Sequence, residues 1–77
     1  MRLTRREEQV MSLLTGGLKS TQIAECMGVS VRTVHAHLAN IYSKFGVTNR
    51  AGALMQFLKS RLTVEFEVEQ ELYEQRK

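Results

Sequence analysis

Residues 30–46 read Ser-Val-Arg-Thr-Val-His-Ala-His-Leu-Ala-Asn-Ile-Tyr-Ser-Lys-Phe-Gly, and this stretch decides the fold available to the rest of the chain. Ser30 is a suitable N-cap, because its hydroxyl can accept a hydrogen bond from a backbone N–H of the first helical turn. Gly46 is a suitable C-terminal stop, because glycine enters the left-handed conformation without a Cβ clash. Apolar residues recur at helical spacing between them, at Val34, Leu38, Ile41 and Phe45. The pattern predicts one amphipathic helix over about residues 31–45.

The opposite face of this helix has a small, uncharged centre, which is unusual for a helix that meets only water. At about 100° per residue, the face carries Arg32, Ala36, Ala39 and Ser43, flanked by His35 on one side and by Thr33 and Asn40 on the other. Small residues allow close approach to the major groove of DNA, and donors near the helix N-terminus can reach base edges and phosphates. The alternative is an ordinary amphipathic helix with a modest polar face, and this stretch alone leaves both interpretations open.

The composition is that of one small globular domain with segregated charge. The chain has 77 residues and a net charge of +3. Residues 1–62 carry nine Lys and Arg against three Glu, whereas residues 63–77 carry five Glu against two basic residues. A basic body suits a polyanionic partner such as nucleic acid, although the same charge could serve solubility alone.

Cysteine content and hydropathy point to the cytoplasm. The single cysteine, Cys26, excludes an intrachain disulfide and favours a reducing compartment. The N-terminus lacks the apolar core of a signal peptide, and no apolar run reaches membrane-spanning length. We therefore expect a cytoplasmic protein with no membrane partner and no evident small-molecule partner.

A first helix is predicted near the N-terminus. Thr4-Arg5-Arg6-Glu7 is a capping-box pattern, so the helix should begin at about Arg5. It should end at about Thr15, because Gly16-Gly17 follows. We expect the helix to bury Val10, Leu13 and Leu14, with Met11 at the margin of the buried face.

A second helix is predicted over residues 21–27, with Ser20 as its N-cap and with Ile23, Ala24 and Met27 facing inward. Gly28-Val29-Ser30 would then be a three-residue turn between this helix and the long one. This is the spacing of a helix-turn-helix, in which the first helix braces the second across the DNA backbone.

A fourth helix is predicted from Arg50 to about Arg61, with Asn49 or Thr48 as N-cap. Ala53, Leu54 and Phe57 form its inner face. A second apolar strip on the other side comprises Ala51, Met55, Leu58 and Leu62, with Lys59 beside it, and we call these five residues the helix-4 strip. An unpaired apolar strip usually indicates a partner, and a twofold homodimer is the commonest way to cover one. The alternative is that the tail folds back over it.

The acidic tail, residues 63–77, is ambiguous. Val64-Glu65-Phe66-Glu67-Val68 alternates like a strand, while Val64, Val68 and Leu72 fit a helical stripe. With no other strand predicted, a helical extension is favoured. Its glutamates would oppose nucleic acid, so the tail should lie away from the basic face.

The motifs together resemble the LuxR/FixJ (GerE-type) family of helix-turn-helix domains, from Leu3 to about Leu58. The resemblance rests on Leu3-Thr4-x-Arg6-Glu7, Gly17 and Ile23-Ala24, then Ser30-x-x-Thr33-Val34-x-x-His37, Asn40-Ile41-x-x-Lys44-Phe45-x-Val47 and Arg50. Sigma-factor region 4 shares some of these elements, but the segment from Lys44 to Arg50 favours the LuxR type.

The resemblance implies an all-α, four-helix domain over residues 1–62 that dimerises through its fourth helix and binds inverted repeats as a bacterial transcription regulator. By position it implies base contacts from His35, Ala36 and Ala39, and backbone contacts from Thr33 and Lys44. The family often has Lys or Arg where this chain has His35 and Ala39, so this chain has fewer charged side chains to contact base edges. The family's usual receiver or small-molecule domain is absent from these 77 residues, so we expect either a stand-alone regulator or a fragment of a longer chain.

The sequence therefore predicts a non-enzymatic, sequence-specific DNA-binding protein that acts as a homodimer and needs no cofactor. Helix N-termini attract phosphates, and Ser20 lies at one of them. The predicted DNA-binding residues are Ser20, Arg32, Thr33, His35, Ala36, Ala39, Asn40, Ser43, Lys44 and Arg50. The alternative is a protein-interaction module that binds RNA polymerase or another regulator through the fourth helix and the acidic tail.

No catalytic or metal-binding set is predicted. His35 and His37 lie two residues apart, so they face different ways on a helix and cannot share a metal. Cys26 adds no ligand at a recognisable zinc spacing, and no nucleophile–base pair or pair of catalytic carboxylates is evident. His37 borders the apolar stripe, and we expect it to be half-buried.

Overall fold

The computed structural model describes residues 2–61, and within them the chain is entirely helical, with no strand. The helices are α1 (Arg5–Thr15), α2 (Ser20–Met27), α3 (Val31–Phe45) and a fourth helix over residues 50–61. The all-α, four-helix prediction is confirmed. The acidic tail and Leu62 lie outside the described residues. None of the helices described is both long and apolar enough to cross a lipid bilayer.

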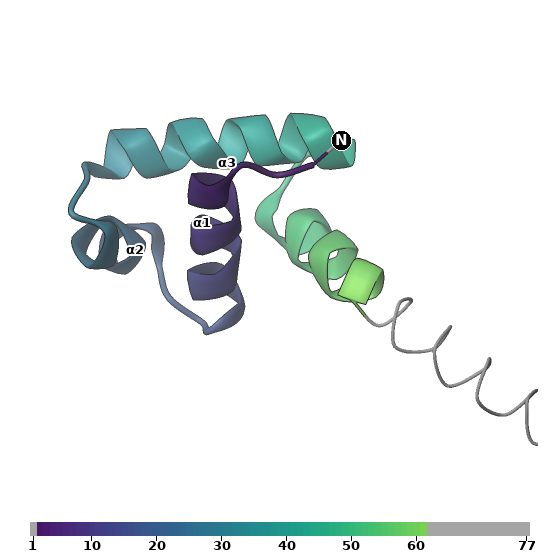
Figure 1. Ribbon diagram of the computed structural model, residues 1–77, viewed down its shortest axis with the longest axis horizontal. Helices are drawn as coiled ribbons and strands as arrows, with labels where there is room; N and C mark the ends of the chain where they lie inside the picture. Colours follow the sequence, from purple (N-terminus) through teal and green to yellow (C-terminus); the bar gives the residue numbers. More distant parts are fainter. Residues whose placement is uncertain (1, 62–77) are drawn as a thin grey trace, which may run out of the picture.

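The long helix α3 spans one side of the domain, and the other helices pack beneath it (Figure 1). α2 lies under its N-terminal end, α1 crosses beneath its middle, and the fourth helix descends from its C-terminal end. The Gly28-Val29-Ser30 turn between α2 and α3 has the predicted length. Gly28 adopts φ +68°, a left-handed conformation that glycine enters without strain. The helix-turn-helix geometry is confirmed.

Local capping defines α1 and α3 as predicted. The Thr4 hydroxyl accepts from the Glu7 backbone N–H at 3.1 Å, and Glu7 Oε1 accepts from the Thr4 N–H at 2.8 Å, which completes the capping box. The Ser30 hydroxyl accepts from the Thr33 N–H at 3.1 Å, and Gly46 ends α3 in the left-handed region.

The start of α2 differs from the prediction, since Ser20 is the first helical residue and Lys19 is the N-cap. The Lys19 N–H donates to Gln22 Oε1 at 2.8 Å, so Gln22 supplies the capping contact. The Ser20 hydroxyl is thereby free for a tertiary contact. At the fourth helix, Asn49 is the N-cap, because its Oδ1 accepts from the Gly52 N–H at 2.8 Å.

The core is centred on the apolar stripe of α3, whose Val34, Leu38 and Ile41 are buried while Phe45 is half-buried. The other buried apolar residues are Val10, Met11 and Leu14 of α1, Ile23 and Ala24 of α2, and Ala53 and Phe57 of the fourth helix.

In α1 the buried face is rotated relative to the prediction, because Met11 is fully buried and Leu13 only half-buried. The buried residues of α1 follow one helical stripe, Glu7, Val10, Met11 and Leu14. The expectation missed this register because Glu7 is polar and was not counted in the stripe. Leu13 instead borders a cleft beside Met27 of α2.

Candidate nucleic-acid interface

The outer face of α3 is exposed as the helical pattern predicts. Most of the candidate side chains on it are exposed, namely Arg32, His35, Ala36, Ala39, Asn40 and Ser43, while Thr33 and His37 are half-buried. The Thr33 and Ser30 hydroxyl oxygens lie 3.0 Å apart, so the two share a hydrogen bond at the start of α3. The face offers a charged donor at its N-terminal end and a small, uncharged centre, which is the shape that a groove-binding helix requires.

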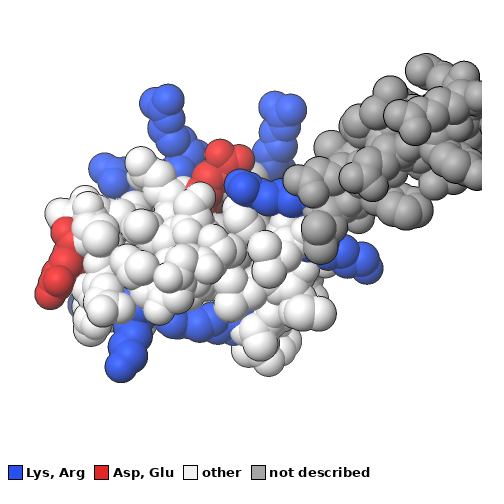
Figure 2. Space-filling model, turned by 90° about the horizontal axis from the view of Figure 1, so that it is seen from below, with Lys and Arg blue, Asp and Glu red and all other residues white. Residues whose placement is uncertain are grey.

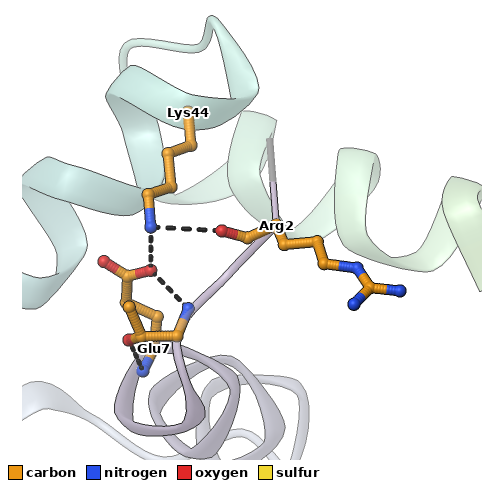
Figure 3. Close-up of polar contacts among 4 residues, drawn as sticks. Arg2, Glu7 and Lys44 are labelled. Carbon is orange, nitrogen blue, oxygen red and sulfur yellow. Dashed lines mark hydrogen bonds and ion pairs between the residues drawn. The ribbon is translucent and has the colours of Figure 1, made fainter.

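Lys44 joins the last turn of α3 to the first turn of α1 (Figure 3). Its ammonium donates to Glu7 Oε1 at 2.6 Å and to the Arg2 backbone carbonyl at 3.2 Å. The Glu7 side chain is only 4% exposed and that of Lys44 is 21% exposed, so the ion pair is largely shielded from water. Lys44, a candidate DNA contact, is therefore also paired with α1 inside the domain.

The charge of Glu7 is held by its neighbours. Burial alone would raise the pKa of Glu7, but the hydrogen bonds from Lys44 and from the Thr4 backbone N–H, together with the Lys44 charge, hold the pKa below its usual range. The sequence analysis used Glu7 only as half of a capping box and missed this contact. Its signal was the position of Glu7 three residues before Val10, on the same helical stripe.

Arg50 and Ser20 form the second polar contact between distant segments. The Arg50 guanidinium, on the first residue of the fourth helix, donates to Ser20 Oγ on the first residue of α2. Both side chains are half-buried. Two residues predicted separately as DNA contacts are thus brought together and bonded to each other.

The helix-4 strip is exposed wherever the structure describes it. Met55 is 72% and Leu58 47% exposed, and Ala51 and Lys59 are exposed beside them. Met55 and Leu58 are the exposed large hydrophobic residues found among residues 2–61.

The charges are spread around the edges of the domain when it is seen from the side opposite α3 (Figure 2). Lys and Arg side chains project from several edges, and the middle of this face is largely without charge. In the described part of the chain, His, Cys and Glu side chains form no group of three that could hold a metal ion.

Comparison with known proteins agrees with this geometry. Residues 1–57 match the family model described as bacterial regulatory proteins, luxR family. A helix-turn-helix whose long second helix presents a small outer face defines a class of DNA-binding domain. The chain belongs to the luxR family of bacterial regulatory proteins.

The relatives carry regulatory names and are longer. The chain is 46% identical over 52 residues to the probable transcriptional regulatory protein SgaR of Hyphomicrobium methylovorum, covering 68% of this chain and 25% of that protein. It is 38% identical over 58 residues to the transcriptional regulatory protein DegU of Brevibacillus brevis, covering 75% of this chain and 25% of DegU. The chain thus spans about a quarter of the length of these relatives.

A solved structure shows the same fold. The crystal structure of the response regulator ChrA, from a heme-sensing two-component system, matches with a TM-score of 0.76 and 39% sequence identity. The match covers 80% of this chain and 31% of that chain.

Proposed function

We propose that this chain binds double-stranded DNA sequence-specifically, with α3 in the major groove, and regulates transcription in the bacterial cytoplasm. The observation that carries the proposal is the exposed outer face of α3, where Ala36 and Ala39 form the small centre and Arg32 stands near the N-terminal end. The Lys44–Glu7 ion pair supports the proposal, because it holds α3 against α1 before DNA is bound. Less conformational freedom is therefore lost on binding.

The proposed contacts divide into two kinds. Base-edge contacts come from His35, Ala36, Ala39, Asn40 and Ser43. Phosphate contacts come from Ser20, Arg32, Thr33, Lys44 and Arg50. Lys44 and Arg50 would contact DNA with the donors that their intramolecular bonds leave free, since an ammonium has three N–H donors and a guanidinium five.

We further propose that the helix-4 strip, Ala51, Met55, Leu58, Lys59 and Leu62, is the interface of a homodimer. The exposure of Met55 and Leu58 supports this, because large apolar side chains adjacent on one helix are costly to leave in water. A twofold dimer would present two copies of α3 to an inverted repeat.

The same exposure favours a second candidate function. The helix-4 strip could instead bind RNA polymerase or another regulator, with the acidic tail taking part. A monomeric chain that retains Met55-dependent binding to purified RNA polymerase would favour this candidate over the homodimer.

The direct test places a carboxylate on the proposed reading face. Ala36→Glu sets a negative charge against the groove, so affinity for a duplex enriched by the wild-type chain should fall at least about a hundredfold. Gln9→Glu is the matched control, because Gln9 is exposed on α1 and the charge change is the same. Equal affinities of the two variants, both folded by circular dichroism, would contradict the proposal.

A further inference from the structure

The hydrogen bond from Arg50 to Ser20 joins the fourth helix to α2, and α3 lies between these two helices in the sequence. The residues are 30 apart in sequence, and each is the first residue of its helix. Within residues 2–61, this is the one side-chain hydrogen bond that links the fourth helix to the helix-turn-helix unit. The remaining links are the short connection after Gly46 and the packing of Ala53, Leu54 and Phe57 against the core.

Apolar packing sets which face of the fourth helix turns inward, because Ala53, Leu54 and Phe57 lie on one stripe that packs against the core. This packing holds the N-terminal end of the helix, at Arg50, less directly. Ala53 offers a small contact, and Phe57 lies a full turn further along the helix. A guanidinium is planar and directional, so its bond to Ser20 Oγ fixes the N-terminal end of the helix against the start of α2.

We propose that Arg50 is a positioning residue: by bonding Ser20, it fixes the orientation of the dimerising fourth helix relative to α2 and α3, and thereby sets the spacing between the two half-sites that the dimer accepts. The inference rests on the proposed function, because it requires the helix-4 strip to form a twofold dimer. Any rotation between the fourth helix and α2 is repeated in the partner by symmetry, so its effect on the distance between the two α3 helices is doubled.

The geometry of DNA makes spacing a sensitive readout. One added base pair moves a half-site by about 3.4 Å along the duplex and rotates it by about 34°, given about 10.5 base pairs per turn. A rigidly held fourth helix should discriminate strongly against that change, whereas a loosely held one should tolerate it.

The experiment starts from the inverted repeat that the wild-type chain enriches from random duplexes. Binding is measured to this repeat, to versions with the spacer one base pair shorter or longer, and to a single half-site. Ser20→Ala removes the acceptor, and Ser20→Thr retains it. Arg50→Lys keeps the charge but replaces the planar fork. Circular dichroism and thermal melting establish that each variant is folded, and Arg50→Lys tests the proposal independently if Ser20→Ala does not fold.

We expect Ser20→Ala and Arg50→Lys to bind the optimal spacer about tenfold more weakly, because a fourth helix that is no longer held against α2 must be ordered when the DNA is bound. Their penalty for a one-base-pair change in spacer should fall at least about fivefold. This penalty is the ratio of two affinities of the same variant, so a phosphate contact that Ser20 or Arg50 also makes cancels from it. Ser20→Thr should restore the wild-type discrimination.

Two outcomes would overturn the inference while leaving the proposed function intact. One is an equal loss of affinity on every spacer and on the single half-site, which is the result expected of a contact to the DNA backbone that has no positioning role. The other is unchanged spacer discrimination in both variants. A wild-type chain that enriches no inverted repeat would refute the proposed dimeric function, and this inference with it.

Discussion

The Lys44 ammonium lies 2.6 Å from Glu7 Oε1 and connects the last turn of α3 to the first turn of α1. The same ammonium donates to the Arg2 carbonyl, and the same carboxylate oxygen accepts from the Thr4 N–H. One ion pair therefore orders the N-terminal segment, the start of α1 and the end of α3 together. The proposed DNA-binding helix is fixed at one end by this pair and at the other by the turn after α2.

Removing Lys44 should destabilise the domain more than its exposure suggests. Lys44→Met leaves the Glu7 carboxylate shielded without its cation, and we expect a loss of about 2 kcal/mol in the free energy of unfolding, below the range for a fully buried pair because Lys44 is 21% exposed. Urea denaturation followed by circular dichroism measures it.

The double variant is the control for that prediction. Glu7→Gln with Lys44→Met removes both charges, so its loss should be clearly smaller than the sum of the two single losses. Strict additivity would show that the two side chains do not interact energetically.

The same pair gives the stability a defined dependence on pH. The pKa of Glu7 is lowered in the folded state, so its contribution is fully present above the unfolded pKa, about 4.3, and is lost as the pH falls through the lower folded value. The stability difference between the wild-type chain and Glu7→Gln should be constant from about pH 7 to 5 and shrink below about pH 4. A difference that grows on acidification would contradict the lowered pKa.

Local and tertiary features differed in how far sequence could predict them. The bounds of α3 were predictable because Ser30, Gly46 and the apolar stripe act within the helix itself. The Glu7–Lys44 and Arg50–Ser20 contacts join residues 37 and 30 apart, so no local pattern encodes them. The start of α2 was misplaced by one residue because both Ser20 and Gln22 can supply a cap, and only the tertiary contact of Ser20 with Arg50 distinguishes them.

The candidate site shows the same division. Exposure of Arg32, Ala36 and Ala39 followed from helical periodicity alone. The half-burial of Lys44 and Arg50 depends on how α1, α2 and the fourth helix pack, and their intramolecular bonds appear only in the structure.

Substitutions on α3 should separate affinity from specificity. Arg32→Ala should weaken binding to all sequences by a similar factor and reduce the salt slope by about 0.9, because it removes one phosphate contact. Ala39→Ser or His35→Ala should change the preference among half-site sequences by about 1 kcal/mol or more at a single position. Fluorescence anisotropy on an enriched and a random duplex measures both effects, and an equal loss on the two duplexes for all three variants would refute this division.

Charges on the helix-4 strip should separate the protomers. Met55→Asp and Leu58→Asp replace exposed side chains, so the fold should survive while the proposed interface acquires like charges facing each other. We expect sedimentation equilibrium to show a monomer at concentrations where the wild-type chain dimerises. Gln56→Asp, on an exposed position of the same helix, is the control and should leave the dimer in place.

The central claim is that α3 reads DNA sequence as part of a twofold dimer, and selection of bound duplexes from a random library tests it most directly. The purified chain would be used at near-physiological salt, with its fold established by circular dichroism. We predict enrichment of an inverted repeat whose half-sites are about one helical turn apart. A folded chain that enriches no sequence would contradict the claim.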